Sequence, residues 1–258
     1  MKSRPSPVRF VIFAAPRTGS NLLCSLLNAH PHILCHHGMF NPGGIHHARD
    51  RGDLAAALGT PLERDADPLS FLDKIWQTAG REAAVGFKIN RGEDLFASDV
   101  LLRDPSVRKI MLKRRNRVRA YVSEKLAQIT GVWESYDSSV VAEPPKLEVD
   151  AQALQKHAQN NAVYYAQMEA VLTATGQGWF ETHYELLGDW AEVTRILAYL
   201  GIEATAPLTP TCRKRGVDDL GRVIANLPEL SEALRDTPLF QDIHSRDVPD
   251  IHSHQPVR

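Results

Sequence analysis

The sequence predicts an α/β protein in which a mostly parallel central sheet is flanked by helices. Two observations lead to this fold class. Short apolar runs typical of buried strands alternate along the chain with longer stretches of helical periodicity. The first run also leads through a glycine-containing loop directly into a helix. Parallel strands joined in this way need right-handed crossovers, which place helices on both faces of the sheet.

The first elements lie between residues 9 and 31. Residues 9–15 form a continuous apolar run, as expected of a strand buried on both faces. Residues 16–20 have the composition of a turn, and residues 21–29 then place four leucines on one helical face. Pro31 ends this helix.

The alternation continues through the chain. Further strands are predicted at residues 84–89, 109–112 and 178–182, and helices at residues 117–129, 150–173 and 189–200, with Gly201 as a C-terminal cap. We interpret the segment at about residues 131–147 as a loop or insertion and the segment at about residues 241–258 as a tail. We therefore expect one domain over residues 1–258, with its core at about 9–235.

Composition excludes several classes of protein. The chain has 258 residues, of which 43% are hydrophobic, and this fraction argues against disorder. Its three cysteines form no Cys-x-x-Cys pair, which argues against a disulfide scaffold and favours a reducing compartment. No apolar run reaches the roughly 18 residues of a membrane span, and we find no signal peptide pattern. These features predict a cytoplasmic protein.

The formal charge of −1 conceals a basic run. Between Arg103 and Arg119 there are eight basic residues and one acidic residue, and a second basic group stands at residues 213–215. A solvated surface is the ordinary explanation of such a run. A nucleic-acid surface is a further alternative, which the near-neutral total charge and the apolar strand inside the run oppose.

The loop after the first strand is a candidate anion site. A loop between a buried strand and a helix gathers free backbone N–H groups and the positive end of the helix dipole. Here Thr18 and Ser20 add hydroxyls, Gly19 permits close approach, and Arg17 adds a planar charged donor. A tight turn with a surface arginine is the alternative. The Walker pattern of nucleotide kinases and NTPases is absent, which disfavours that class.

A second motif stands at the next strand-to-helix junction. Arg115 follows the strand at residues 109–112, and Ser123 stands eight residues further, two turns into the following helix. At this spacing, both side chains could contact one ligand.

Together these motifs resemble the sulfotransferases that use 3'-phosphoadenosine 5'-phosphosulfate (PAPS), in the bacterial branch with trehalose 2-sulfotransferase and the nodulation and carbohydrate sulfotransferases. Residues 16–23, which include Asn21, are similar to that family's 5'-phosphosulfate loop, and Arg115 with Ser123 to its 3'-phosphate motif. Residues 178–187 resemble its later Tyr-Glu-x-Leu segment, and Lys214 and Arg215 its adenine and 3'-phosphate loop. The resemblance implies a P-loop-like three-layer fold, PAPS as co-substrate, 3',5'-ADP (PAP) as product, and no metal.

The resemblance also implies an in-line transfer of a sulfuryl group to a hydroxyl. Arg17, with the N–H groups of Gly19 and Ser20, would stabilise negative charge on the departing phosphate oxygen. The family's general base is a glutamate where this chain has Gly38. His37 is our first substitute and His36 our second, since imidazole ordinarily titrates near about pH 6.5. A structural role for either histidine is the alternative, as is a PAP- or PAPS-binding protein with weak or lost catalysis.

Other residues near these motifs have less specific interpretations. Lys88 could contact the acceptor or the sulfuryl group, although a surface lysine is the expected alternative. Trp133 and Tyr136 could form an aromatic platform for the acceptor or pack within a loop, and Tyr165 is assigned to the core. A zinc or nickel site is the rival interpretation of six clustered histidines: His30, His32, His36, His37, His46 and His47.

The expected acceptor is a hydroxyl of a carbohydrate, a glycolipid or a small metabolite, with no nucleic-acid partner. The patterns leave the oligomeric state open, a homodimer included.

Overall fold

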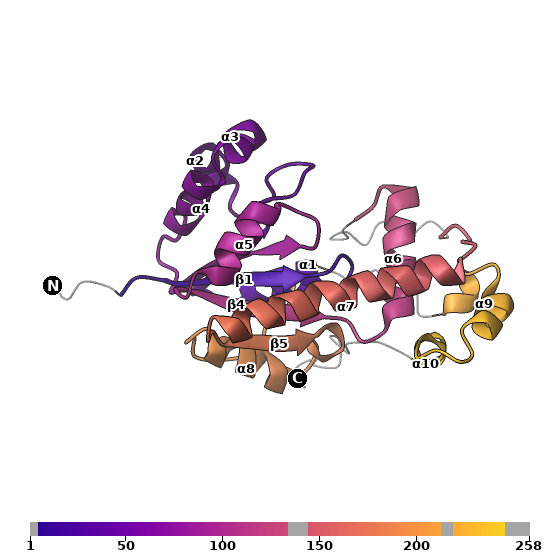
Figure 1. Ribbon diagram of the computed structural model, residues 1–258. Coiled ribbons are helices and arrows are strands. Elements are labelled where there is room, and N and C mark those ends of the chain that lie inside the picture. Colours follow the sequence, from indigo (N-terminus) through magenta and orange to yellow (C-terminus); the bar gives the residue numbers. More distant parts are fainter. Residues whose placement is uncertain (1–4, 134–143, 213–218, 246–258) are drawn as a thin grey trace.

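A five-stranded parallel sheet forms the centre of the computed structural model, which describes residues 5–133, 144–212 and 219–245 (Figure 1). The strand order is β2-β3-β1-β4-β5, and every neighbouring pair is parallel. The strands are β1 (Val8–Ala14), β2 (Ile33–Gly38), β3 (Ala84–Asn90), β4 (Val107–Lys113) and β5 (Trp179–His183). The predicted α/β class with a parallel sheet is confirmed.

Helices cover both faces of the sheet because alternate residues of β1 enter different cores. Phe10 and Ile12 pack with α1 (Ser20–Asn28) and α8 (Trp190–Tyr199). Val11 and Phe13 pack on the other face, where the covering helices are α4 (Pro68–Gln77), α5 (Leu95–Arg103) and α7 (Ala151–Ala174). The side chains of these four residues of β1 are fully buried, which explains its unbroken apolar sequence.

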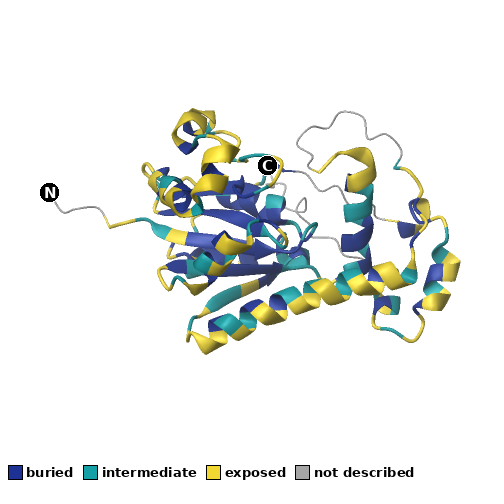
Figure 2. Cartoon of the chain, turned by 45° about the horizontal axis from the view of Figure 1, so that its top comes forward, coloured by how far each residue is buried: buried dark blue, intermediate teal, exposed yellow. Residues whose placement is uncertain are grey.

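A third hydrophobic cluster lies at one end of the molecule (Figures 1 and 2). It contains residues of α6 (Arg117–Thr130), of the first half of α7, of α9 (Leu227–Ala233) and of α10 (Leu239–His244). The long helix α7 therefore joins this cluster to the sheet, since its second half supplies Tyr165, Met168 and Leu172 to the core against β1. Tyr165 is buried, as predicted from the sequence.

Several segments differ from their prediction or were not predicted. The sequence analysis assigned no element to β2 or α5, nor to α2 (Ala55–Leu58), α3 (Pro61–Ala66) and α4. Residues 241–244, predicted as the start of the tail, belong to α10. Within the predicted insertion, Leu147 is buried and exchanges two backbone hydrogen bonds with residues 223 and 225, each 2.7 Å long. Across the described ranges, no helix is both long enough and apolar enough to cross a membrane.

Candidate active site

The carboxyl ends of all five strands meet at one edge, where α/β proteins bind their ligands. The loop that leaves β1 at this edge has an unusual backbone. Arg17 has φ 61° and Gly19 has φ 90°, so both lie in the left-handed region. A Cβ atom on Gly19 would lie 2.4 Å from Cδ2 of Tyr184, so the close approach of this ring also requires glycine. Left-handed backbone at a non-glycine residue is typical of ligand-binding loops.

Two residues hold this loop in place. Arg114 donates from Nη1 to the carbonyl oxygen of Arg17 at 3.0 Å, and its guanidinium lies over the Tyr184 ring, 4.5 Å from the centroid. Tyr165 accepts the backbone N–H of Ala15 at 2.7 Å and donates to the Leu112 carbonyl at 2.6 Å. These contacts tie the ends of β1 and β4 together.

The structure brings the two sequence motifs together through Arg17. Its Nε donates to Ser123 Oγ at 2.9 Å, and Nη1 donates to the carbonyl oxygen of Trp133. Thr18 turns its hydroxyl inward to the Ala15 carbonyl at 2.8 Å, so it stabilises the loop. Ser20 Oγ donates to Asn90 Oδ1 of β3 at 3.4 Å.

Arg115 lies at the same edge, with its side chain exposed. Its backbone N–H and that of Asn116 donate to Glu185 Oε1, at 2.8 and 3.2 Å. Among the described residues, the Arg115 guanidinium makes no hydrogen bond, and Ser123 meets Arg17 rather than Arg115. The pKa of His183 is lowered by burial first and then by the positive charge of Arg115.

Most of the basic run is paired within the fold. Lys109 is 1% exposed and bonds the Asp104 carbonyl and Gln177, and Lys113 pairs with Glu169 and Glu181. Further pairs in the run are Arg103 with Asp99, Arg108 with the Tyr199 carbonyl, and Arg117 with Asp242. This pairing does not favour a nucleic-acid surface.

The ends of β2 and β3 form the opposite side of the site. His37 is buried, and its Nδ1 lies 3.4 Å from Asn21 Oδ1 in the first turn of α1. The Cβ position of Gly38 lies 3.5 Å from Lys88 Nζ. Lys88 is only 6% exposed, so its interpretation as a surface lysine is wrong. Lys88 pairs with Gly38 in the register of β3 and β2, so its amine lies near the position at which the resembled family has a glutamate.

His36 has a structural role. Its Nε2 donates to Thr78 Oγ1 at 2.9 Å, because the Thr78 hydroxyl itself donates to a carbonyl, and its Nδ1 accepts the Ala48 N–H at 3.1 Å. Burial, followed by the charges of His47, His37 and Arg51, lowers the pKa of His36 to about 3. Both ring nitrogens are occupied, which removes His36 as a candidate base.

The remaining histidines show no metal arrangement. His30 Nε2 lies 3.1 Å from the Glu203 carbonyl, and its Nδ1 accepts the His32 N–H at 3.2 Å. Within residues 5–133, 144–212 and 219–245, no three histidine, cysteine, aspartate or glutamate side chains are grouped as metal ligands.

Glu93 is a buried carboxylate that the sequence analysis missed. Its oxygens accept the Asn90 N–H at 3.0 Å and the Asn90 side-chain amide at 2.9 Å, and Asn41 donates to it at 3.4 Å. Glu93 thereby orients the Asn90 side chain that meets Ser20. Its position three residues after Asn90, just beyond the end of a strand, was the available signal.

Three predicted residues cannot be placed at the site. Tyr136, Lys214 and Arg215 lie outside the described residues. Trp133 is 47% exposed and contributes its backbone carbonyl to Arg17.

A strand, a left-handed loop and a helix thus bring backbone N–H groups and Arg17 to the sheet edge, where Arg17 meets Ser123. Loops of this kind at a helix N-terminus are a common arrangement for binding anions. Similarity to a curated relative supports a sulfotransferase enzyme of the bacterial type.

This assignment rests on similarity along most of the chain. No family model matches. The chain is 27% identical to nodulation protein H of Rhizobium tropici over 233 residues, which are 88% of this chain and 90% of that protein. Two solved structures are also similar: the sulfotransferase domain of the curacin biosynthetic pathway (12% identity, 98% and 87% of the two chains, TM-score 0.44) and a sulfotransferase from Alicyclobacillus acidocaldarius (19% identity, 95% and 98%, TM-score 0.43).

Proposed function

We propose that this sulfotransferase moves the sulfuryl group of PAPS to a hydroxyl of a carbohydrate, glycolipid or small metabolite. The observation that carries the proposal is the 2.9 Å hydrogen bond from Arg17 Nε to Ser123 Oγ. It joins the loop suited to a 5'-phosphosulfate to the motif suited to a 3'-phosphate. PAPS carries both anionic groups, whereas ATP has no 3'-phosphate.

Arg17 and the N–H groups of Gly19 and Ser20 are the proposed contacts of the 5'-phosphosulfate of PAPS. Negative charge develops on the oxygen between sulfur and phosphate during in-line displacement, and a fixed guanidinium next to it stabilises the transition state. The contacts of Arg114 and Tyr165 hold this loop before substrate binds. Such preorganisation avoids rearrangement during the reaction.

Arg115 and Ser123 are the proposed contacts of the 3'-phosphate. Asn21, which follows Ser20, is a further proposed contact at the 5'-phosphosulfate. Glu185 fixes the Arg115 backbone, so the exposed guanidinium is directed from a rigid turn. Lys214 and Arg215 remain proposed contacts of the adenine and 3'-phosphate on the family resemblance.

His37 is the proposed general base. Its Nδ1 lies 3.4 Å from Asn21 Oδ1, and imidazole is the side chain that most often serves as a general base. Lys88, whose Nζ lies 3.5 Å from the Cβ position of Gly38, is the proposed contact of a sulfuryl oxygen or of the acceptor. The alternative of a binding protein without catalysis is not favoured. Cys24 and Cys35 are buried free thiols, which supports the proposed cytoplasmic location.

The donor is tested by calorimetric titration with 3',5'-ADP, 5'-AMP and ATP. We expect clear preference for 3',5'-ADP, and we expect Arg115→Ala to abolish it. Arg103→Ala is the matched control, since Arg103 belongs to the same basic run but pairs with Asp99 on α5. Equal binding of ATP and 3',5'-ADP by the wild type would overturn the PAPS assignment.

Catalysis is tested by sulfuryl transfer from PAPS to a panel of hydroxyl acceptors. Arg17→Ala and His37→Gln should each lower kcat by about 10²- to 10⁴-fold, the usual contribution of charge stabilisation or of a general base. The glutamine keeps a polar side chain beside Asn21 but cannot accept the proton. Full activity of His37→Gln would show that His37 is not the base.

A further inference from the structure

The turn that leads from Arg115 into α6 is held by two carboxylates from later parts of the chain. Three successive backbone N–H groups donate to them: those of Arg115 and Asn116 to Glu185 Oε1, and that of Arg117 to Asp242 Oδ2 at 2.9 Å. Asp242 lies in α10. Because these three N–H groups already have acceptors, a phosphate bound at this turn depends mainly on side chains.

Asp242 binds the first residue of α6 through both its backbone and its side chain. Arg117 donates from Nε to Asp242 Oδ2 at 2.7 Å and from Nη2 to Oδ1 at 3.1 Å, in addition to its backbone bond. Two parallel charge-assisted hydrogen bonds fix the direction of a contact as well as its length. Helix α10 therefore sets the position of the first turn of α6.

The N-cap of α6 is also oriented by α10. Asn116 is 2% exposed, and its Oδ1 accepts the Arg119 N–H at 2.8 Å, the usual bond of a capping side chain. Its Nδ2 donates to the Asp242 carbonyl at 2.7 Å and to Ser245 Oγ at 2.9 Å. The start of α6 thus depends on α10 at two successive residues.

Apolar packing holds α10 against α6 independently of these polar contacts. Leu239 and Ile243 of α10 are buried in the same hydrophobic cluster as Val118 and Val122 of α6 (Figure 1). A change confined to the Asp242 carboxylate leaves this packing in place. The polar contacts can therefore be tested without removing the helix.

We infer that α10 belongs to the donor site and that Asp242 is a positioning residue for the 3'-phosphate, acting through the first turn of α6. Arg115 directly precedes this turn, and Ser123 stands six residues beyond Arg117, about 9 Å along the helix axis. Binding groups keep their effect only when they are held to within about 0.5 Å, and a shift of the turn moves both of these proposed phosphate contacts. The inference rests on the proposed function, which assigns the 3'-phosphate to Arg115 and Ser123.

The test is calorimetric titration with 3',5'-ADP and 5'-AMP, which differ only in the 3'-phosphate. Asp242→Asn keeps the size of the side chain and the backbone carbonyl that binds Asn116, but an amide cannot accept both hydrogen bonds of the guanidinium. We expect the ratio of the two dissociation constants to fall about tenfold, the equivalent of one charge-assisted hydrogen bond. The affinity for 5'-AMP should stay within about twofold of the wild type.

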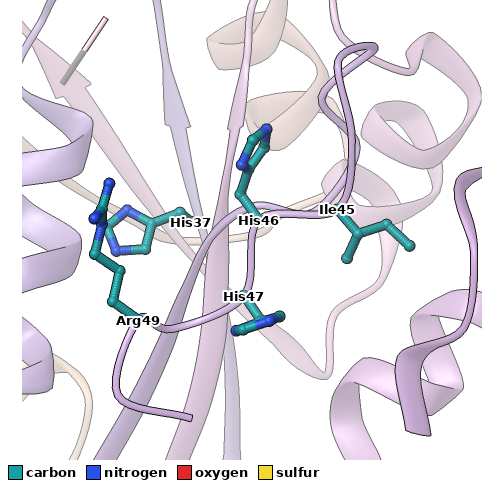
Figure 3. Close-up of a pocket in the computed structure, with 5 residues that line it drawn as sticks. All are labelled: His37, Ile45, His46, His47 and Arg49. Carbon is teal, nitrogen blue, oxygen red and sulfur yellow. The ribbon is translucent and has the colours of Figure 1, made fainter. Parts of the chain in front are cut away.

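A second variant and two controls define the route of the effect. Arg117→Met should give the same loss, and combining it with Asp242→Asn should add little, since both remove one contact. Glu232→Gln removes the same charge from α9, where Glu232 pairs with Arg235. His46→Gln changes the lining of a cavity of about 240 Å³ beside His37, on the opposite side of the site (Figure 3). Both controls should keep the wild-type ratio.

An unchanged ratio in Asp242→Asn overturns the inference, as does an equal loss of affinity for both nucleotides, which indicates a general structural effect. Fully additive losses in the double variant, or a reduced ratio in Glu232→Gln, also overturn it. If the wild type prefers 3',5'-ADP and Asp242→Asn keeps that preference, the donor proposal stands and only this inference fails. If the wild type does not distinguish the two nucleotides, the donor proposal fails and the inference fails with it.

Discussion

Gly38 stands where the family that this chain resembles has its general base, and a side chain there would require Asn41 to shift by a few tenths of an ångström. A Cβ atom would lie 3.1 Å from Asn41 Cβ and 3.5 Å from Lys88 Nζ. We expect Gly38→Glu, added to His37→Gln, to recover about tenfold in kcat, because a carboxylate beside Lys88 supplies a new base. The rate of sulfuryl transfer from PAPS to an acceptor gives this kcat. Gly38→Gln in the same background has equal size but no base, and identical rates for the two double variants would contradict the prediction.

His36 makes stability depend on pH. Its pKa is about 3 in the folded protein against 6.5 for the free side chain. Below pH 6.5 the unfolded chain therefore binds a proton that the folded chain does not, so the stabilisation is complete above pH 6.5 and is lost as the pH falls toward 3. At pH 5 the loss is about 2 kcal/mol.

Urea unfolding at pH 7.5 and pH 5 measures this loss. In His36→Gln the amide can still donate to Thr78 but does not titrate, so the difference between the two pH values should shrink by about the same 2 kcal/mol. An unchanged difference would mean that other groups cause the acid sensitivity.

Among the elements, helix α7 contributes to the candidate active site through the Tyr165 hydroxyl. Tyr165→Phe leaves the buried N–H of Ala15 without its partner. We expect the free energy of unfolding to fall by about 1–3 kcal/mol and the affinity for 3',5'-ADP to fall several-fold, because the loop loses an anchor. Urea unfolding and calorimetry measure the two effects. Tyr164→Phe removes the neighbouring hydroxyl as a control, and equal losses in both variants would contradict a specific role for the bridge.

The elements also show what sequence patterns can predict. β1, β3, β4 and β5 were found because each contains an apolar run. β2 was missed because two of its six residues are histidines, and their burial depends on distant partners: Thr78 for His36 and Asn21 for His37. A buried polar residue with its partner elsewhere in the chain leaves no periodic signal.

On the scale of the whole molecule, the parts of the candidate site that form local sequence patterns could be predicted. These are the loop at Arg17 and the eight-residue spacing from Arg115 to Ser123, and the sheet edge brings Arg17 to Ser123. The role of Arg114 could not be derived, because it depends on a carbonyl 97 residues away and on the Tyr184 ring. The burial of Lys88 likewise follows from the position of β3 between β2 and β1.

The third hydrophobic cluster raises the question of whether the molecule unfolds as one unit. Helix α7 supplies Leu154 to that cluster and Leu172 to the core against the sheet, and both side chains are fully buried. One continuous helix couples the two regions, so we expect a single calorimetric transition whose van't Hoff and calorimetric enthalpies agree.

Leu154→Ala and Leu172→Ala form a matched pair on this helix. Each should cost about 2–5 kcal/mol and lower the Tm of the same transition by several degrees, since about 1 kcal/mol corresponds to 2–4 °C in a chain of this size. Circular dichroism and fluorescence should report the same midpoint in each variant. If Leu154→Ala instead separates a low-temperature transition from one that keeps the wild-type Tm, the cluster around α6, α9 and α10 folds independently and the single-domain prediction is wrong.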